Sequence, residues 1–365
     1  MRLLPEVLDC VVDHLSTDRS ALKACGLTCR QWLPRSRFHL FREVRLSVGR
    51  GIVAANTARN NMDRFLEVVD TSFSDILAMI RILTISYVDK ECLEAEHLLR
   101  FSPCSQLQHL GVVLPQGKQE QDAEILHLCH TQLTSVANNW SGLLGFSIRF
   151  YSASLSAIFD IIACFPRLEQ LTLMGDSMTD TLDSLAPLPP RIQSLQTSVW
   201  QGSELFYRHL LSLSTPPLFR ILKIDHSMGM HDVAPFAKYL QCSGHAVQTL
   251  ALTIWKYFGT YERLALQHCT NLRHISILSY EDDPGDDLAV YIRDLLSGVT
   301  SSNLSIIEID MSALFFRETK ITAATIDLEW IFAHPRFRNL QKFVLSGVEL
   351  LLARDAANTP KDTEL

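Results

Sequence analysis

Residues 168–173 read Leu-Glu-Gln-Leu-Thr-Leu, which places apolar side chains at the first, fourth and sixth positions. The alternation over the last three residues is typical of a short β-strand with one buried face. This spacing occurs ten times, and successive copies start 24 to 36 residues apart. The copies start at Ile80, Leu107, Leu143, Leu168, Ile192, Phe219, Val247, Leu272, Leu304 and Leu340; the copy at Ile192 is weaker because its last position is Thr197. An internal repeat therefore organises most of the chain.

The segments between the copies carry apolar residues at helical spacing. One stripe contains Leu155, Ile158, Phe159 and Ile162, and another contains Leu288, Tyr291, Ile292 and Leu295. A repeated strand and helix predict an α/β fold with parallel strands and right-handed crossovers, stacked into a curved solenoid with strands inside and helices outside. Over roughly residues 77–350 this pattern resembles the leucine-rich-repeat family. The resemblance implies an irregular leucine-rich-repeat solenoid.

The chain departs from that family three residues after the last apolar position of each copy. The family usually has Asn or Cys there, where the side chain satisfies the amides of the turn. This chain has Val88, Pro115, Tyr151, Asp176, Trp200, Ser227, Trp255, Tyr280, Ser312 and Val348. We therefore expect irregular turns and uneven curvature. The four aromatic residues, Tyr151, Trp200, Trp255 and Tyr280, either fill the rim of the core or line a recognition edge that binds a target protein.

Charged strand residues provide further candidates for target binding. Because successive side chains of a strand point to opposite faces, alternation assigns four of them to the concave side. They are Lys223, Asp225, Glu308 and Asp310.

Residues 1–46 have a helical pattern. Pro5 suits the first turn of a helix, and Leu4, Val7, Leu8, Val11, Val12 and Leu15 follow at helical spacing. Asp18 is a plausible N-cap for a second helix over Arg19–Arg30. Three short helices cannot bury this much apolar surface among themselves, so part of it is expected to face another protein or the next domain.

The order Leu4-Pro5-Glu6-Val7-Leu8, then Leu15, Asp18 and Ala21-Leu22, then Cys29-Arg30-x-Trp32, resembles the F-box, and residues 34–42 look like the ending common in fungal members. The resemblance implies docking to the Skp-type adaptor of cullin-RING ubiquitin ligases. The positions that match the family's apolar contacts are Leu4, Pro5, Val7, Leu8, Val11, Leu15, Leu22 and Trp32. Arg19 departs from the pattern, because many members carry an apolar residue there.

Together the two resemblances imply the substrate-recognition subunit of a Skp-cullin-F-box type ubiquitin ligase, in which the F-box docks the adaptor and the solenoid binds an unidentified target protein. Such a receptor is not itself an enzyme, since its partner subunits catalyse the transfer. Residues 1–46 carry eight Lys/Arg and five Asp/Glu, a net charge of +3 that would favour an acidic adaptor. The alternative is a non-ligase binding scaffold whose N-terminal helices only cap the solenoid.

The expected organisation has four parts: an F-box at 1–46, a helical linker or cap at 47–76, the solenoid at 77–350 and a mobile polar tail at 351–365. The linker contains an apolar helix with Phe65, Leu66, Val68 and Val69.

The composition of the chain argues against two classes of partner, nucleic acid and membrane. Lys+Arg number 33 and Asp+Glu 40, a net charge of −7, which argues against nucleic acid as a partner because phosphate binding needs a clustered positive field. No apolar run approaches the length of a membrane span. The start lacks a secretion signal, so the nine cysteines are expected to be reduced thiols in the cytoplasm or nucleus.

Motifs for other chemistry are weak, and we expect no catalytic residue, metal or cofactor. Gly49-x-Gly51-x-x-Ala54 has the outline of a dinucleotide turn, but it follows the F-box pattern. Gly175-Asp176-Ser177 lacks the Asp-x-x-His of its esterase family. The pair Cys25 and Cys29, and His127-x-Cys129-His130, lack a second ligand pair. The acidic run at 281–287 either caps the helix that begins near Leu288 or docks a basic partner.

Overall fold

The computed structural model describes residues 5–49, 61–71, 76–94, 97–116, 119–179, 185–225, 233–254, 264–279, 288–310 and 328–346. In these ranges the chain has an α/β fold in which eleven strands follow one another in sequence order. Every strand pair whose register is described is parallel. The chain divides into two compact units: unit 1 is Met1–Leu171 with Thr181–Arg191, and unit 2 is Thr172–Asp180 with Ile192–Leu365.

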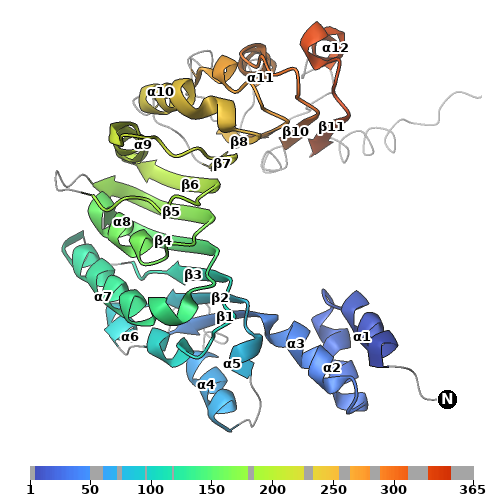
Figure 1. Ribbon diagram of the computed structural model, residues 1–365, viewed down its shortest axis with the longest axis vertical. Helices are drawn as coiled ribbons and strands as arrows, with labels where there is room; N and C mark the ends of the chain where they lie inside the picture. The colour runs from blue at the N-terminus through green and yellow to red at the C-terminus, as the bar shows by residue number, and fades with distance from the viewer. Residues whose placement is uncertain are drawn as a thin grey trace, which may run out of the picture. The chain divides into compact units, whose positions relative to one another are not determined.

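Unit 1 opens with three helices and continues with alternating strands and helices. Its elements are α1 (Pro5–His14), α2 (Arg19–Thr28), α3 (Leu33–Arg42), β1 (Glu43–Val48), α4 (Asn61–Thr71), α5 (Ile76–Met79), β2 (Ile82–Tyr87), α6 (Lys90–Glu94), a 3-10 helix η1 (His97–Phe101), β3 (His109–Val113), α7 (Gln119–Ala137), η2 (Asn138–Trp140), β4 (Gly145–Ser154), α8 (Leu155–Ala163) and the start of β5 (Gln170–Thr179). The helices α6, α7 and α8 lie on one side of β2, β3 and β4 (Figure 1).

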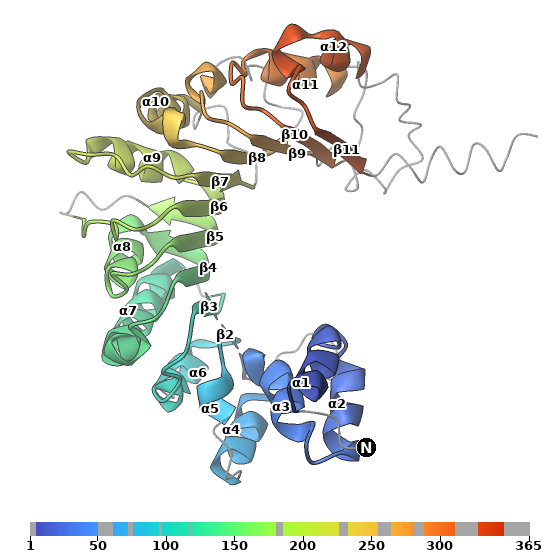
Figure 2. The same cartoon turned by 45° about the vertical axis from the view of Figure 1, so that its right-hand side comes forward.

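Unit 2 continues the same plan. It contains the rest of β5, then β6 (Ser194–Gln201), α9 (Ser203–Ser212), β7 (Ile221–Ile224), α10 (Val233–Ser243), η3 (Gly244–Ala246), β8 (Thr249–Ile254), η5 (Leu266–His268), β9 (His274–Ser279), α11 (Leu288–Ser297), β10 (Ile306–Asp310), α12 (Leu328–Ala333), η8 (Pro335–Phe337) and β11 (Lys342–Ser346). Figure 2 shows α9 and α10 together on one side of β6, β7 and β8.

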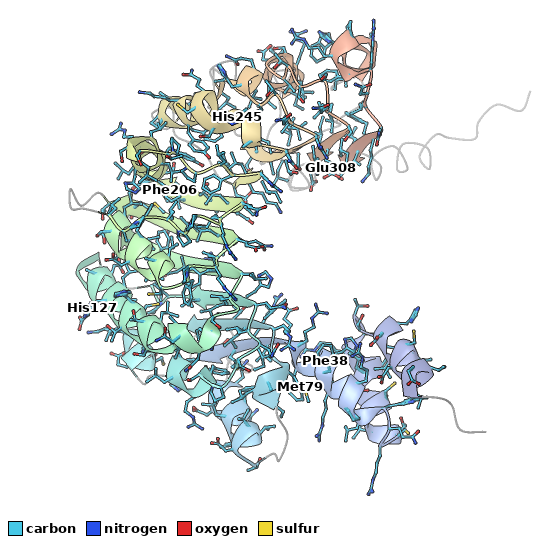
Figure 3. The ribbon with its side chains drawn as sticks, in the orientation of Figure 1. Phe38, Met79, His127, Phe206, His245 and Glu308 are labelled. Carbon is cyan, nitrogen blue, oxygen red and sulfur yellow. The ribbon has the colours of Figure 1, made fainter. Side chains whose placement is uncertain are left out.

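The core of each unit lies between its strands and its helices. On β2 the side chains of Leu83 and Ile85 are fully buried, while Thr84 and Ser86 on the other face are only partly covered. The helical stripe of α8 is buried at all four predicted positions. In unit 2 the buried ring of Phe206 on α9 lies 5.8 Å from that of Tyr207, which in turn contacts the rings of Phe236 and Tyr239 (Figure 3). One face of the sheet is therefore covered by helices, and we call the other the open face.

A recurring backbone contact sets the register of successive strands. At the start of β3, β4, β5 and each of β7 to β11, two consecutive N–H groups donate to one carbonyl of the preceding repeat. Gln108 and His109 both donate to Arg81 O, at 2.8 and 2.9 Å, and Arg273 and His274 both donate to Gln248 O, at 2.8 and 3.0 Å. Because the contact has the same form in these eight repeats, it fixes where their strands begin without a special side chain.

The ten predicted strands are confirmed, since each apolar spacing coincides with one of β2 to β11. The eleventh, β1, was not predicted as a repeat strand; it crosses the expected boundary at residue 46 and pairs with β2 in the register Glu43 to Ile82. The predicted helices at 155–162 and from 288 are α8 and α11. Within the described ranges, no helix is both long enough and apolar enough to cross a bilayer.

Candidate protein-interaction surfaces

The three N-terminal helices begin where their sequence signals place them. Pro5 is the first residue of α1, a position that needs no backbone donor. The Asp18 carboxylate accepts hydrogen bonds from the backbone N–H groups of Ser20 and Ala21, both at 2.9 Å, and so caps α2. The predicted N-cap is confirmed, and it satisfies donors that the helix leaves without partners.

The three helices enclose a small core of their own. Its side chains are Leu8, Val12, Leu22 and Cys25, and each is at most 9% exposed. Ser36 on α3 is fully buried beside Gly26 of α2, where a Cβ atom would lie 3.7 Å from the Cβ of Ser36. These contacts make α1, α2 and α3 a module with a defined inner and outer side.

An ion cluster joins α1 to α3. The Asp13 carboxylate accepts hydrogen bonds from Arg35 Nε at 2.5 Å, from Arg35 Nη2 at 2.7 Å and from His39 Nε2 at 2.7 Å. The Arg35 guanidinium also lies 5.0 Å from the centre of the Phe38 ring, a cation–π distance. The hydrogen bonds from Arg35 and His39 hold the pKa of Asp13 well below its usual range, so this carboxylate stays charged and bound.

The outer side of the module carries exposed apolar side chains. Val7 and Val11, one turn apart on α1, are 44% and 46% exposed, and Leu27 on α2 is 88% exposed. Single exposed apolar residues are common on protein surfaces. Val7 and Val11, on one face of a helix of ten residues, are a candidate contact area for another protein, and Leu27 is a further exposed apolar residue of the module.

The predicted adaptor contacts fall into distinct groups. Val7 and Val11 are exposed, Leu15 and Trp32 are partly exposed, and Leu8 and Leu22 are buried in the module's own core. Pro5 begins α1, and Leu4 lies outside the described residues. Leu27 was not among the predicted contacts, although it is 88% exposed. Periodicity alone therefore did not separate the inner from the outer apolar positions.

The departure at Arg19 has a structural role. Its guanidinium donates from Nη2 to the backbone oxygen of Leu40, near the end of α3, at 3.4 Å. A cation is favourable at that end, where helix carbonyls have no partner. Arg19 thus ties α2 to α3 by a polar contact at a position where an apolar residue was expected.

The module continues directly into the sheet. α3 ends at Arg42 and β1 begins at Glu43, and the N–H of Arg81 donates to Arg42 O at 2.9 Å. The ring of Phe41 lies 6.5 Å from that of Phe65 on α4, which stacks on Phe101 at 6.1 Å. Figure 3 places Phe38 of α3 next to Met79 of α5, in agreement with the packing of these two helices. The module is therefore fixed to unit 1 without an intervening linker.

The open face of unit 2 contains the predicted charged residues. Lys223 is exposed between buried Leu222 and Ile224, as alternation requires. Asp225 follows at the end of β7, and its carboxylate accepts hydrogen bonds from Gln196 Nε2 at 2.8 Å and from Thr253 Oγ1 at 3.5 Å. Both donors are neutral, so the Asp225 charge is oriented by its neighbours without being cancelled by them.

Glu308 lies on the same face of β10, as Figure 3 shows. Its carboxylate is 3.1 Å from His274 Nε2 on β9 and 3.5 Å from Lys342 Nζ on β11. Asp310 occupies the next open-face position, paired in register with Leu278 and Ser346. Gln196, Thr253, His274 and Lys342 were not among the predicted site residues, although the same alternation places them on this face.

The predicted aromatic residues are only partly described. Tyr151 is 41% exposed and lies within β4, since this strand runs on to Ser154. Trp200 is in β6, and Trp255 and Tyr280 lie outside the described residues. Asp176 likewise lies within β5, so the expectation of a turn at these positions of β4, β5 and β6 is wrong: the strands are longer than the repeat pattern implies.

The described residues contain no group of three or more His, Cys, Asp and Glu side chains that could hold a metal ion. His127 is on the outer side of α7 (Figure 3), whereas Cys129 on the same helix is fully buried, so the two do not share a face. Gly49 has φ of 109° and ends β1 against Cys92 and Asp89; Gly51 and Ala54 of the same motif lie outside the described residues.

Comparison of the chain with models of known protein families gives no match, and comparison with curated proteins gives none either.

Proposed function

We propose that this protein is the substrate-recognition subunit of a Skp-cullin-F-box type ubiquitin ligase. The α1–α3 module docks the Skp-type adaptor, and the open face of the repeat strands binds the target. The observation that carries the proposal is the exposure of Val7, Val11 and Leu27 on a module that has a buried core of its own. An apolar face of this kind gains stability when a partner covers it.

The connection between module and sheet supports the same role. Ubiquitin transfer through a receptor depends on holding a target near the conjugating enzyme, which raises their effective concentration. The direct step from α3 into β1, together with the bond from Arg81 to Arg42, fixes the module to unit 1. The protein needs no nucleophile for this work, because its partner subunits perform the chemistry.

Coexpression of the full chain with a Skp-type adaptor tests docking. Val7→Asp with Val11→Asp places two charges on the outer side of α1, where half-exposed side chains contribute little to folding. Val68→Asp is the matched control, because Val68 is 47% exposed on α4. We expect wild type and the control to copurify with the adaptor and the double variant to lose it, with unchanged thermal melting. Leu8→Asp is a poor test, since Leu8 is 7% exposed and its loss would disrupt the module.

The alternative is a binding scaffold in which α1–α3 only cap the repeats. The packing of α3 on α5 and its continuation into β1 favour such a cap. A scaffold predicts no adaptor complex at micromolar concentration, and equal behaviour of the double variant and the control. That result would exclude the ligase receptor and leave the open face as a binding surface.

A further inference from the structure

The strand-start edge of unit 2 has an uneven distribution of charge. Five described segments lead from the helical side into β7 to β11: residues 212–220, 243–248, 264–273, 297–305 and 334–341. They contain no Asp or Glu. They contain four arginines and three histidines: Arg220, Arg273, Arg336, Arg338, His245, His268 and His334. Because parallel strands all begin at one edge of a sheet, these segments lie along the same edge.

The backbone arranges one residue of each segment in a row, which we call the entry row. Its members are Arg220, Gln248, Arg273, Ser305 and Gln341. Each later member donates its N–H to the carbonyl of the member before it, at distances of 2.8 to 2.9 Å. Adjacent strands are about 4.8 Å apart, so Arg220 and Arg273 are separated by roughly twice that distance. The N–H groups of the four later members donate within the row and that of Arg220 donates to Gln193 O, so the side chains of the row are the donors left for a partner.

The two row arginines are available for a partner. The side chains of Arg220 and Arg273 are exposed, and neither has an ion pair or side-chain hydrogen bond within the described structure. Gln248 between them adds an amide donor. Arg336 differs, because its guanidinium donates to the backbone oxygen of Ser297 and fastens two segments together. His245, labelled in Figure 3, has an exposed ring on the same edge.

The described carboxylates of unit 2 lie on strands and helices, apart from Asp225, which directly follows β7. On the open face they occur toward the strand ends, at Asp225 and Asp310, with Glu308 two residues before the latter. The positive charge of the entry row is thus not cancelled from within its own segments. An uncancelled basic row attracts an anionic partner and speeds its association.

The exposure of aromatic side chains distinguishes two candidate anionic partners, single-stranded nucleic acid and an acidic protein segment. Proteins that bind single-stranded nucleic acid stack the bases on exposed aromatic rings. The two aromatic residues of the five segments, Phe219 and Phe337, are 0% and 6% exposed, so no stacking platform is present on the edge. Arginine also pairs with carboxylates in a fixed two-pronged geometry. We propose that the strand-start edge of unit 2 binds an acidic segment of a partner protein.

The test uses the full chain and a fluorescein-labelled peptide of twelve residues rich in Glu and Asp. The variant is Arg220→Gln with Arg273→Gln. Its control is Lys238→Gln with Arg293→Gln, which removes the same charge from exposed positions on α10 and α11. At low salt we expect the row variant to weaken binding at least tenfold and the control to change it less than twofold. Arg220→Lys with Arg273→Lys keeps the charge and should bind more tightly than the Gln pair.

Three results would overturn the proposal: no peptide binding by the wild-type protein at low salt, equal weakening by the control pair, or binding by a folded Gln pair that is as tight as that of wild type. A single-stranded DNA of twelve thymidines is the comparison probe. Binding of this DNA more than tenfold tighter than the peptide, lost in the row variant, would assign the edge to nucleic acid instead. The edge is in unit 2 and the adaptor surface in unit 1, so each proposal can fail without the other.

Discussion

The imidazole ring of His109 on β3 lies over Gly145, its register partner on β4. A Cβ atom at position 145 would overlap the ring at Nδ1. Glycine therefore provides room for a half-buried histidine on the open face of unit 1. Burial holds the pKa of this histidine below its ordinary value, because the charged form loses solvation.

Gly145→Ala should displace the His109 ring. The displaced ring becomes solvated, so its pKa should rise toward the ordinary value, and the free energy of unfolding should fall by about 1–3 kcal/mol, the usual cost of overpacking. NMR titration of labelled histidine and chemical denaturation measure the two effects. Gly142→Ala is the control, since the nearest atom to its Cβ would be Leu107 O at 3.8 Å. Equal effects of both substitutions would contradict the arrangement.

Asp13→Asn should loosen α1 from α3. The neutral amide keeps the shape of the carboxylate but loses the charged hydrogen bonds from Arg35 and His39. Amide hydrogen exchange in α1 and α3 should become faster, while exchange in β3 and β4 is unchanged. Because Asp13 is more than a third exposed, salt screens the contact, and the difference from wild type should shrink in high salt.

The stabilisation of the fold by the Asp13 carboxylate should depend on pH in a defined direction. The folded pKa of Asp13 is lowered, so the unfolded chain binds the proton more readily. The stabilisation is fully present above the unfolded Asp pKa of about 3.9, and it is lost as pH falls through the lower folded value. Wild type and Asp13→Asn should therefore differ at pH 6–7 and converge in strong acid. A difference that grows in acid would contradict the contact.

The sequence predicted the repeat strands well because their signal is local. Leu168, Leu171 and Leu173 are all at most 1% exposed, as the spacing requires. β1 was missed as a repeat strand because its copy of the spacing, Phe41, Val44 and Leu46, overlaps the end of the F-box pattern. β4 and β5 were predicted too short because Tyr151 and Asp176 occupy family turn positions, although buried Phe150 continues the alternation of Phe146 and Ile148 in β4.

The candidate sites depend on contacts between residues that are far apart in the sequence or on different helices, and local sequence patterns do not predict such contacts. Val7 and Leu8 are neighbours with similar apolar side chains, yet only Leu8 is covered, because its side faces the other helices of the module. The bond from Gln196 to Asp225 joins residues 29 apart in sequence and requires the register of β6 on β7. The entry row likewise can be identified only when the strand order is known. Local patterns predict elements, and the strand register determines which side chains meet.

Tyr151 tests whether the exposed aromatic residue of β4 supports the core. Its ring is 41% exposed, so Tyr151→Ala should lower the free energy of unfolding by only about 0.5 kcal/mol. The neighbouring Phe150 is 4% exposed on the helix-covered face, and Phe150→Ala should cost about 3–5 kcal/mol. Chemical denaturation compares the two. A large loss of stability in Tyr151→Ala would assign this ring to the core and remove it from the candidate target surface.

Thiol labelling tests the burial pattern and the adaptor surface together. Burial raises the pKa of Cys104, Cys129 and Cys269 to about 12, and a thiol reacts with alkylating reagents only as its thiolate. Cys10 and Cys242 are exposed, so iodoacetamide at pH 8 should label them first, followed by mass spectrometry of the peptides. The three buried thiols should react only after unfolding.

Because Cys10 lies beside Val11 on α1, a bound Skp-type adaptor should protect it while Cys242 in unit 2 stays reactive. Unchanged labelling of Cys10 in a purified complex would mean that the adaptor contacts another face of the module.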